Sequence, residues 1–243
     1  MKKILSILAL GAVASVGYSQ GTVQVYSIAA GNAIYTNSAL SVFAGGSGNG
    51  GTSGKTASAA NGFYYTLLCQ AYSPSITTNN PAATGWLQSG ILATNYSGVA
   101  GGIKGNGGNA GAATTGSVWG APTAGNYSDG TLNNFVLVGW SSNLGSTWAT
   151  VSGELAAGWG NIAGYNSANT YFFGVSALGN GYAGAGPNSL PAPDVFGVTT
   201  GMPGGLAGGF SLYSVAPVVV PEPATLAMAA LGGASLLLFR RRK

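Results

Sequence analysis

The sequence has no histidine, a single cysteine and very few charged residues. Only 5% of its 243 residues are Asp, Glu, Lys or Arg. The absence of histidine removes the usual general base and the commonest metal ligand, and it excludes Ser-His-Asp and Cys-His catalysis. The single cysteine, Cys69, excludes an intrachain disulfide. Because Cys69 lies in the middle of an apolar run, it is predicted to be a buried, unreactive thiol.

Charge of either sign is scarce between the two ends of the chain. Six of the eight basic residues are terminal, two at the start and four at the end. The interior holds two lysines and four carboxylates, a net charge of −2: Lys55, Lys104, Asp129, Glu154, Asp194 and Glu222. A nucleic-acid-binding protein needs clustered Lys and Arg to neutralise phosphates. The sequence has no such cluster in its interior and therefore predicts no nucleic-acid partner.

Glycine is abundant, with 43 residues, but without a Gly-X-Y period, which excludes collagen. It occurs with Ser, Thr and Asn between short apolar runs, a composition typical of turns. The richest stretches, 45–62 and 97–131, are predicted to be flexible surface loops. Gly54-Lys55-Thr56 is not read as a phosphate-binding loop, because Asn49 stands where the first glycine of that motif is required.

The first 19 residues have the form of a secretory signal peptide. Lys2 and Lys3 precede an apolar stretch, and small residues precede a polar exit. Cleavage is expected after Ser19, which would leave Gln20 as the new N-terminus. The sequence therefore predicts export through the secretion translocon.

The C-terminal 24 residues, 220–243, form a second targeting segment. The apolar stretch 224–239 has 16 residues, which is ~24 Å as a helix, against a hydrocarbon core of about 30 Å. Arg240, Arg241, Arg242 and Lys243 follow it and favour a cytoplasmic C-terminus by the positive-inside rule. We expect a marginal transmembrane helix that holds the chain briefly in the inner membrane.

Pro221, Glu222 and Pro223, the apolar helix and the basic stop together resemble the PEP-CTERM sorting signal of Gram-negative bacteria. The resemblance implies that exosortase, a membrane-embedded cysteine transpeptidase, acts on this tail in organisms that make extracellular polysaccharide. The start GTVQVYSI and the Gly-rich body also resemble cargo proteins of this system. The arrangement of a strand with Trp140, a loop and a helix from Ser146 resembles that of cargo bodies from Verrucomicrobia-like bacteria.

The body, 20–216, consists of short apolar runs separated by turn-rich spacers, and each run predicts a strand. In 62–72, Phe63, Tyr65, Leu67, Cys69 and Ala71 share one face. In 133–141, Val136, Val138 and Trp140 lie on one side, and Phe135 and Leu137 lie on the other. Further strands are predicted at 22–28, 86–93, 170–178 and 209–215.

These runs predict an all-β fold, a jelly-roll-like β-sandwich, because strands that are apolar on both faces belong inside a two-layer structure. One short helix is predicted from Ser146, its expected N-cap, with Trp148, Val151 and Leu155 at helical spacing and Gly158 beyond the end. Glu154 is expected on the exposed side of this helix.

Glycoside hydrolysis needs only two carboxylates. Asp129 lies in a YSDGT turn, Glu154 on the predicted helix and Asp194 in a PAPDV loop. Each position has an ordinary structural explanation, so no catalytic residue, cofactor-binding residue or metal ligand is assigned.

Aromatic residues make up 10% of the chain, and exposed rings can stack on sugars. Four lie in or beside predicted loops and are candidates for glycan stacking: Trp86, Trp119, Trp159 and Tyr182. The alternative is that they cover the edges of the sandwich.

Three functions remain open. The first is a non-enzymatic protein of the cell surface or extracellular matrix, sorted by an exosortase-type system and associated with exopolysaccharide. The second is a carbohydrate-binding module that uses exposed Trp and Tyr, and the third is an enzyme resembling a glycosidase.

Overall fold

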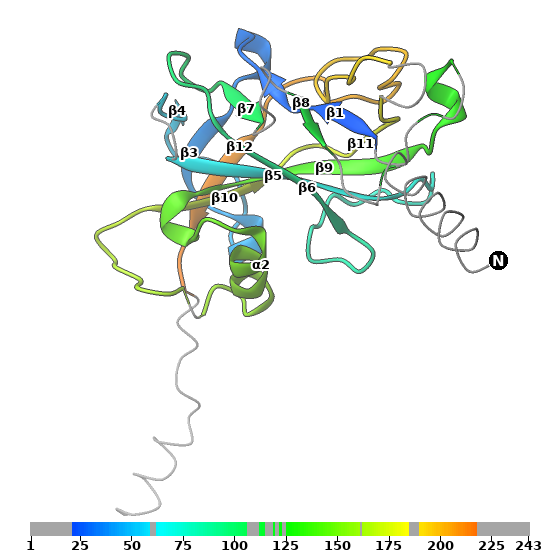
Figure 1. Ribbon diagram of the computed structural model, residues 1–243. Helices are drawn as coiled ribbons and strands as arrows, with labels where there is room; N and C mark the ends of the chain where they lie inside the picture. The colour runs from blue at the N-terminus through cyan, green and yellow to red at the C-terminus, as the bar shows by residue number, and fades with distance from the viewer. Residues whose placement is uncertain are drawn as a thin grey trace, which may run out of the picture.

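The computed structural model describes residues 21–58, 62–105, 112–114, 119, 122, 125–160, 162–184 and 190–217. Within these residues the chain is mainly β-structure with one α-helix (Figure 1). The strands are β1 (Thr22–Gln24), β2 (Tyr26–Ser27), β3 (Tyr35–Leu40), β4 (Ser53–Lys55), β5 (Phe63–Ala71), β6 (Leu87–Asn95), β7 (Ile103–Gly105), β8 (Ala112–Thr114), β9 (Asn133–Ser141), β10 (Tyr171–Val175), β11 (Gly179–Gly181) and β12 (Ser211–Val215). The helical segments are α2 (Trp148–Ala156) and the short 3-10 helices η1 (Ala30–Asn32), η2 (Val42–Ala44), η3 (Tyr127–Asp129) and η4 (Ser142–Leu144).

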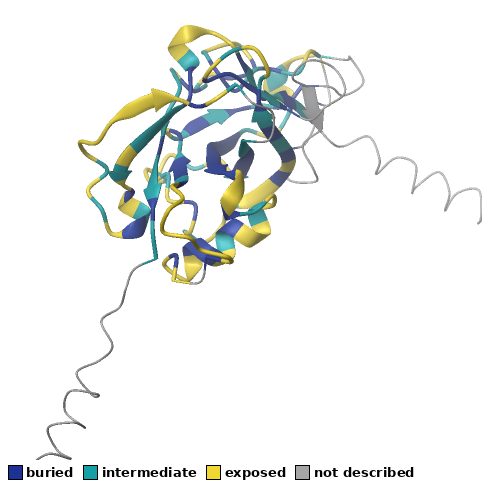
Figure 2. Cartoon of the chain, turned by 90° about the vertical axis from the view of Figure 1, so that its left-hand side faces the viewer, coloured by how far each residue is buried: buried dark blue, intermediate teal, exposed yellow. Residues whose placement is uncertain are grey.

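In the described part of the chain, ten strands form one curled, open sheet, a half-barrel (Figures 1 and 2). The strand order is β2-β7-β6-β5-β9-β10-β12-β3-β4, and β11 pairs with β9 beside this path. Neighbours such as β5 and β9 are antiparallel, whereas β12 and β3 are parallel. Strands β1 and β8 form a separate antiparallel pair.

The central strands β5 and β9 pair along their whole length, from Phe63 opposite Ser141 to Ala71 opposite Asn133. Their side chains alternate between two hydrophobic cores. The concave face of the sheet receives Tyr65, Leu67, Cys69, Phe135 and Leu137. The convex face receives Leu68, Val136, Val138 and Trp140. The predicted division of faces in these two strands is confirmed, with Phe63 packing only partly buried against the concave core.

The concave core is closed by β1 and by the segment that follows residue 190. Val23 of β1 lies in this core, together with Val195, Phe196, Met202 and Leu206. The N–H of Val195 donates to the carbonyl of Gln24 at 2.9 Å, which ties the covering segment to β1. The interior of the half-barrel is therefore packed with side chains.

The convex core is covered by α2. Val151 and Leu155 of the helix are buried there beside Trp140 and Phe173. The helix begins one residue later than predicted, because Thr147 and not Ser146 is its N-cap. The Thr147 hydroxyl accepts from the N–H of Thr150 at 3.3 Å, which satisfies one of the amides exposed at the helix start.

The predicted sandwich is wrong, although the β-rich body with one helix is confirmed. Strands that are apolar on both faces do require cover on both faces. Here the sheet curls around the concave core, and α2 covers the convex core. No second facing sheet of comparable size is therefore needed. The predicted strand 22–28 is also divided, because β1 pairs with β8 and β2 pairs with β7.

The glycine-rich spacers 45–62 and 97–131 contain more regular structure than the predicted loops. The first includes β4, and the second includes β7, β8 and η3. The N–H of Ile34 donates to the carbonyl of Gly101 at 2.9 Å, and the N–H of Gly101 donates to the carbonyl of Thr56 at 2.9 Å. These bonds connect the two spacers and join the end of the sheet that contains β3 and β4 to the end that contains β7. Gly101 has a φ of 79°, a conformation that disfavours other residues.

Both targeting segments, 1–19 and 220–243, lie outside the described residues. Among the residues that are described, no helix has the length and apolar character needed to cross a membrane.

Candidate functional site

Trp119 and Trp159 are fully buried, so neither can stack on an external sugar. The Trp119 indole N–H donates to the carbonyl of Gly181 at 3.2 Å in the concave core. The Trp159 indole N–H donates to the carbonyl of Phe43 at 2.8 Å, and its ring centroid lies 5.0 Å from that of Phe173 in the convex core. The two stacking candidates are therefore core residues on opposite faces of the sheet.

Trp86 and Tyr182 are partly buried. Trp86 packs against the convex core just before β6. Tyr182 follows β11, where its backbone N–H donates to the carbonyl of Gly201 at 2.7 Å. Of the four predicted stacking residues, these two retain partly exposed side chains.

Glu154 is buried, with 7% of its surface exposed, and the prediction of an exposed position on the helix is wrong. Its Oε1 accepts a hydrogen bond from the N–H of Ala163 at 3.4 Å, while Oε2 has no partner. Burial raises the pKa of Glu154, and the Ala163 hydrogen bond partly opposes this. The loop after α2 folds back over the helix and covers the carboxyl group.

The other two carboxylates hold backbone turns. Asp129 is exposed and accepts from the N–H of Asn126 at 3.1 Å, which caps η3. Asp194 accepts from the N–H of Phe196 at 3.0 Å, and burial raises its pKa to about 6. Asp194 precedes Val195 of the concave core, whereas Glu154 precedes Leu155 of the convex core. These two carboxylates thus lie on opposite sides of the sheet and cannot act on one bond. No cluster of metal-ligating residues occurs among the described residues.

Cys69 is buried in β5, and burial raises the pKa of its thiol to about 12. Its thiol lies 3.7 Å from the carbonyl oxygen of Leu87. Gly54-Lys55-Thr56 begins on β4 at the edge of the sheet, and the Thr56 hydroxyl donates to the carbonyl of Ile34 at 3.3 Å. Both features therefore have structural roles.

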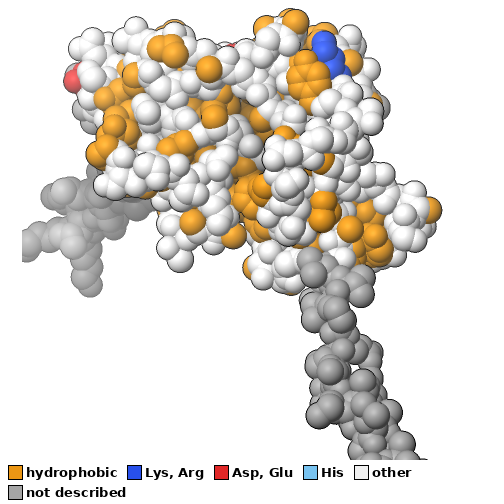
Figure 3. Space-filling view, turned by 180° about the vertical axis from the view of Figure 1, so that it is seen from behind, with side chains coloured by type: hydrophobic (Ala, Val, Ile, Leu, Met, Phe, Trp, Pro, Cys, Tyr) orange, Lys and Arg blue, Asp and Glu red, His pale blue; other side chains and the backbone are white. Residues whose placement is uncertain are grey.

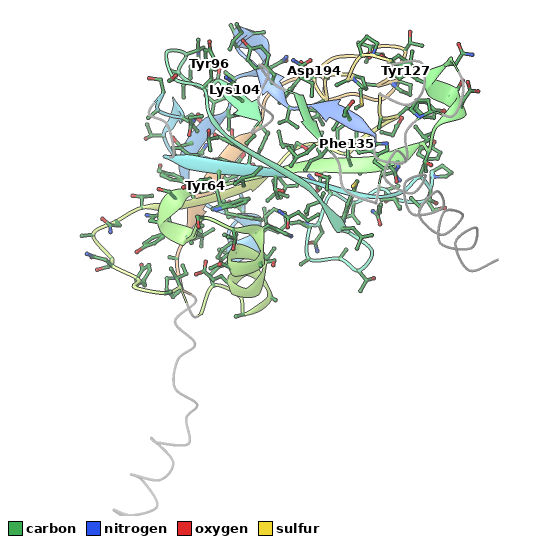
Figure 4. All side chains as sticks on the ribbon, in the orientation of Figure 1. Tyr64, Tyr96, Lys104, Tyr127, Phe135 and Asp194 are labelled. Atoms are coloured by element: carbon green, nitrogen blue, oxygen red, sulfur yellow. The ribbon has the colours of Figure 1, made fainter. Side chains whose placement is uncertain are left out.

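A hollow of about 240 Å³ lies over β6 and β7, and sequence reasoning missed it. It is lined by Leu92, Thr94, Asn95, Tyr96, Ser97, Lys104 and Gly105. Tyr96 and Lys104 lie near each other beside β7 (Figure 4). The body has only two lysines, which could have marked Lys104 as a candidate binding residue. The residues around Lys104, however, depend on strand pairing between distant segments, which the sequence does not show.

The register of four strands places the hollow on the convex face. Tyr26 of β2 is opposite Lys104 of β7, Lys104 is opposite Thr94 of β6, and Thr94 is opposite Tyr64 of β5. Directly opposed residues project to the same side of a sheet. Tyr64 packs partly against the convex core, so the row runs from that core to the edge strand β2. The ring of Tyr26 meets that of Tyr96 edge-on, with centroids 5.9 Å apart.

Residues 219–243 match the family model for the PEP-CTERM protein-sorting motif. The match agrees with the predicted segment 220–243 and includes Pro221, Glu222 and Pro223 with the basic stop. No curated protein and no solved structure matches the chain. The chain thus carries the C-terminal motif of proteins that are exported and sorted to the cell surface by an exosortase.

Proposed function

We propose that this chain is a non-enzymatic protein of the cell surface or extracellular matrix that associates with exopolysaccharide. The PEP-CTERM motif at residues 219–243 is the observation that supports it most directly. In this proposal the translocon exports the chain and the tail holds it briefly in the inner membrane. Exosortase then acts near Pro221-Glu222-Pro223. The resemblance of the body to Verrucomicrobia-like cargo is compatible with this route.

The composition of the body supports a binding or structural role over catalysis. Histidine is absent from the sequence, Cys69 is buried, and Glu154 and Asp194 lie on opposite sides of the sheet. Charged side chains are rare on the face shown in Figure 3, where uncharged polar and apolar groups prevail. Such a surface suits weak association with a hydrated polysaccharide gel.

The intact mass of the surface-exposed protein tests the route. We expect the segment up to Ser19 and the residues after the sorting motif to be missing. Neutralising Arg240, Arg241, Arg242 and Lys243 should cause mis-sorting, while the circular dichroism of the body stays unchanged. A surface form that still ends in Arg-Arg-Arg-Lys would mean that the tail is a plain anchor.

Retention in the matrix tests the second half of the proposal. The native protein should remain with the exopolysaccharide fraction after mild washing and should leave it after enzymatic digestion of the polysaccharide. Equal release before and after digestion would contradict the association.

A dedicated carbohydrate-binding module is the second candidate, and the hollow beside Lys104 favours it. A module binds one polysaccharide saturably, whereas a matrix protein is retained weakly by several. Titration against a panel of polysaccharides distinguishes the two.

A further inference from the structure

We propose that the hollow over β6 and β7 binds an acidic sugar residue of a polysaccharide, with Lys104 pairing with its carboxylate. This inference rests on the second candidate, a carbohydrate-binding module, and names the class of glycan that the module would take.

Lys104 is the first reason. Its side chain is partly buried in the hollow, yet it makes no ion pair or side-chain hydrogen bond with any described residue. The described carboxylates are committed elsewhere: Asp129 caps η3, Glu154 is a buried residue of α2 that accepts from the N–H of Ala163, and Asp194 accepts from the N–H of Phe196. An ammonium group that lines a hollow and has no internal counter-ion favours an anionic ligand.

The hydroxyl groups are the second reason. Thr94, Tyr96 and Ser97 line the same hollow, and none of their hydroxyl groups hydrogen bonds to a described residue. Hydroxyl groups both donate and accept, which matches the hydroxyl groups of a sugar ring. The lining therefore combines one cation with several uncommitted polar groups.

The aromatic and apolar walls are the third reason. Tyr96 lines the hollow and is held by the edge-on ring of Tyr26, while Leu92 packs partly against the convex core. A held ring offers a stacking surface at low conformational cost. The volume of about 240 Å³ is below that of a drug-sized pocket, which suits one ring of a chain that continues into solvent.

A nucleic-acid ligand fits this surface less well. Binding to a phosphate backbone draws on several cations, whereas the hollow offers Lys104 alone and the body, 20–216, carries a net charge of −1. One cation beside hydroxyl groups and a tyrosine fits a single carboxylate on a sugar ring.

Lys55 provides a matched control. It faces Tyr35 across β3 and β4, as Lys104 faces Tyr26 across β2 and β7. Lys55 is exposed, however, and is not part of the hollow. Replacing either lysine by Gln removes the same charge from the surface, so a difference between the two variants isolates the contribution of the hollow.

The test is a titration of the full chain in detergent with alginate, a polymer of uronic acids, with dextran and duplex DNA as parallel probes. We expect saturable binding of alginate that weakens with salt, and little binding of dextran or DNA. Lys104→Gln should weaken alginate binding by about 3- to 10-fold and Tyr96→Ala by about 10-fold. Lys55→Gln should leave it unchanged, and circular dichroism should show all three variants folded.

The proposal is overturned if Lys104→Gln binds alginate as the native chain does, or if Lys55→Gln weakens binding equally. Equal binding of dextran, or tighter binding of DNA, overturns it as well. Should Tyr96→Ala fail to fold, Lys104→Gln and the salt dependence still decide. If the native chain does not bind alginate, and both the native chain and the Lys104→Gln variant are retained in the matrix, this inference fails while the proposed matrix function stands. If the native chain binds alginate but is not retained in the matrix, the proposed matrix function fails while this inference stands.

Discussion

Tyr65 of β5 and Gly139 of β9 are directly opposite each other, and the Tyr65 ring fills the space that a side chain at 139 would need. A Cβ at Gly139 would lie 2.7 Å from Cδ1 of Tyr65 and 2.9 Å from Cδ2 of Leu212. Tyr65 and Leu212 belong to the concave core. The absence of a side chain at one position of the central strand thus permits the close packing of the half-barrel.

Gly139→Ala is expected to destabilise the protein by about 1–3 kcal/mol, because the added methyl group overpacks the core. Gly54→Ala in β4 is the control, since nothing lies within 4 Å of its added Cβ, and it should change the free energy of unfolding by no more than about 0.5 kcal/mol. Urea unfolding measures both. Equal effects at the two glycines would contradict the packing described for Tyr65.

Trp159→Phe should destabilise the fold by about 1–3 kcal/mol, because the partly buried carbonyl of Phe43 loses its hydrogen-bond donor. Trp86→Phe should have a smaller effect, since Trp86 is partly buried and makes no side-chain hydrogen bond with a described residue. Neither substitution should change alginate binding. A Trp159→Phe variant of native stability that no longer binds polysaccharide would restore Trp159 as a stacking residue.

Asp194 is expected to make stability depend on pH. Burial raises its pKa to about 6 from an ordinary value of 3.8, while backbone hydrogen bonds from Phe196 and Tyr26 oppose the rise. The folded state therefore binds more protons between these two values. The contribution of Asp194 to stability is complete below pH 3.8 and is lost as the pH rises through about 6. Burial also raises the pKa of Glu154, which adds a slope of the same sign.

Asp194→Asn should remove this part of the slope and keep an oxygen acceptor for the N–H of Phe196. Because Asp194 is partly exposed, we expect the variant to exceed the native chain by about 1 kcal/mol at pH 8 and to match it near pH 3.5. Thermal unfolding across this range provides the measurement. Parallel curves for the two proteins would contradict the proposed role of burial.

Cys69 should resist alkylation in the native protein. Burial raises the pKa of its thiol to about 12, so almost none is thiolate at pH 8, and the side chain is inaccessible. Iodoacetamide should add one label only in denaturant, as measured by intact mass. Fast labelling of the folded chain at pH 8 would show that β5 opens locally.

Local sequence determined those features that depend on neighbouring residues. Period-2 alternation separated Tyr65 and Leu67 from Leu68 before any partner strand was known, and helical spacing located α2 within one residue at its start. The sorting segment was also recognisable, because a motif, an apolar run and a basic stop follow one another in order. The buried state of Cys69 followed from its position in the most apolar strand.

Only the tertiary structure decided which partner covers each face and which distant strands lie together. A strand that is apolar on both faces requires cover on both. The spacing of its apolar residues, however, does not tell whether that cover is a second sheet, a helix or the curled sheet itself. Loop positions made Trp119 and Trp159 stacking candidates, and helical spacing put Glu154 on an exposed side of α2, whereas packing buries all three. Tyr26, Thr94 and Lys104 share one row because β2, β6 and β7 pair in a register set by contacts far apart in the chain. Local propensity carries no information about such pairing, since the free energy that fixes it comes from the assembled core.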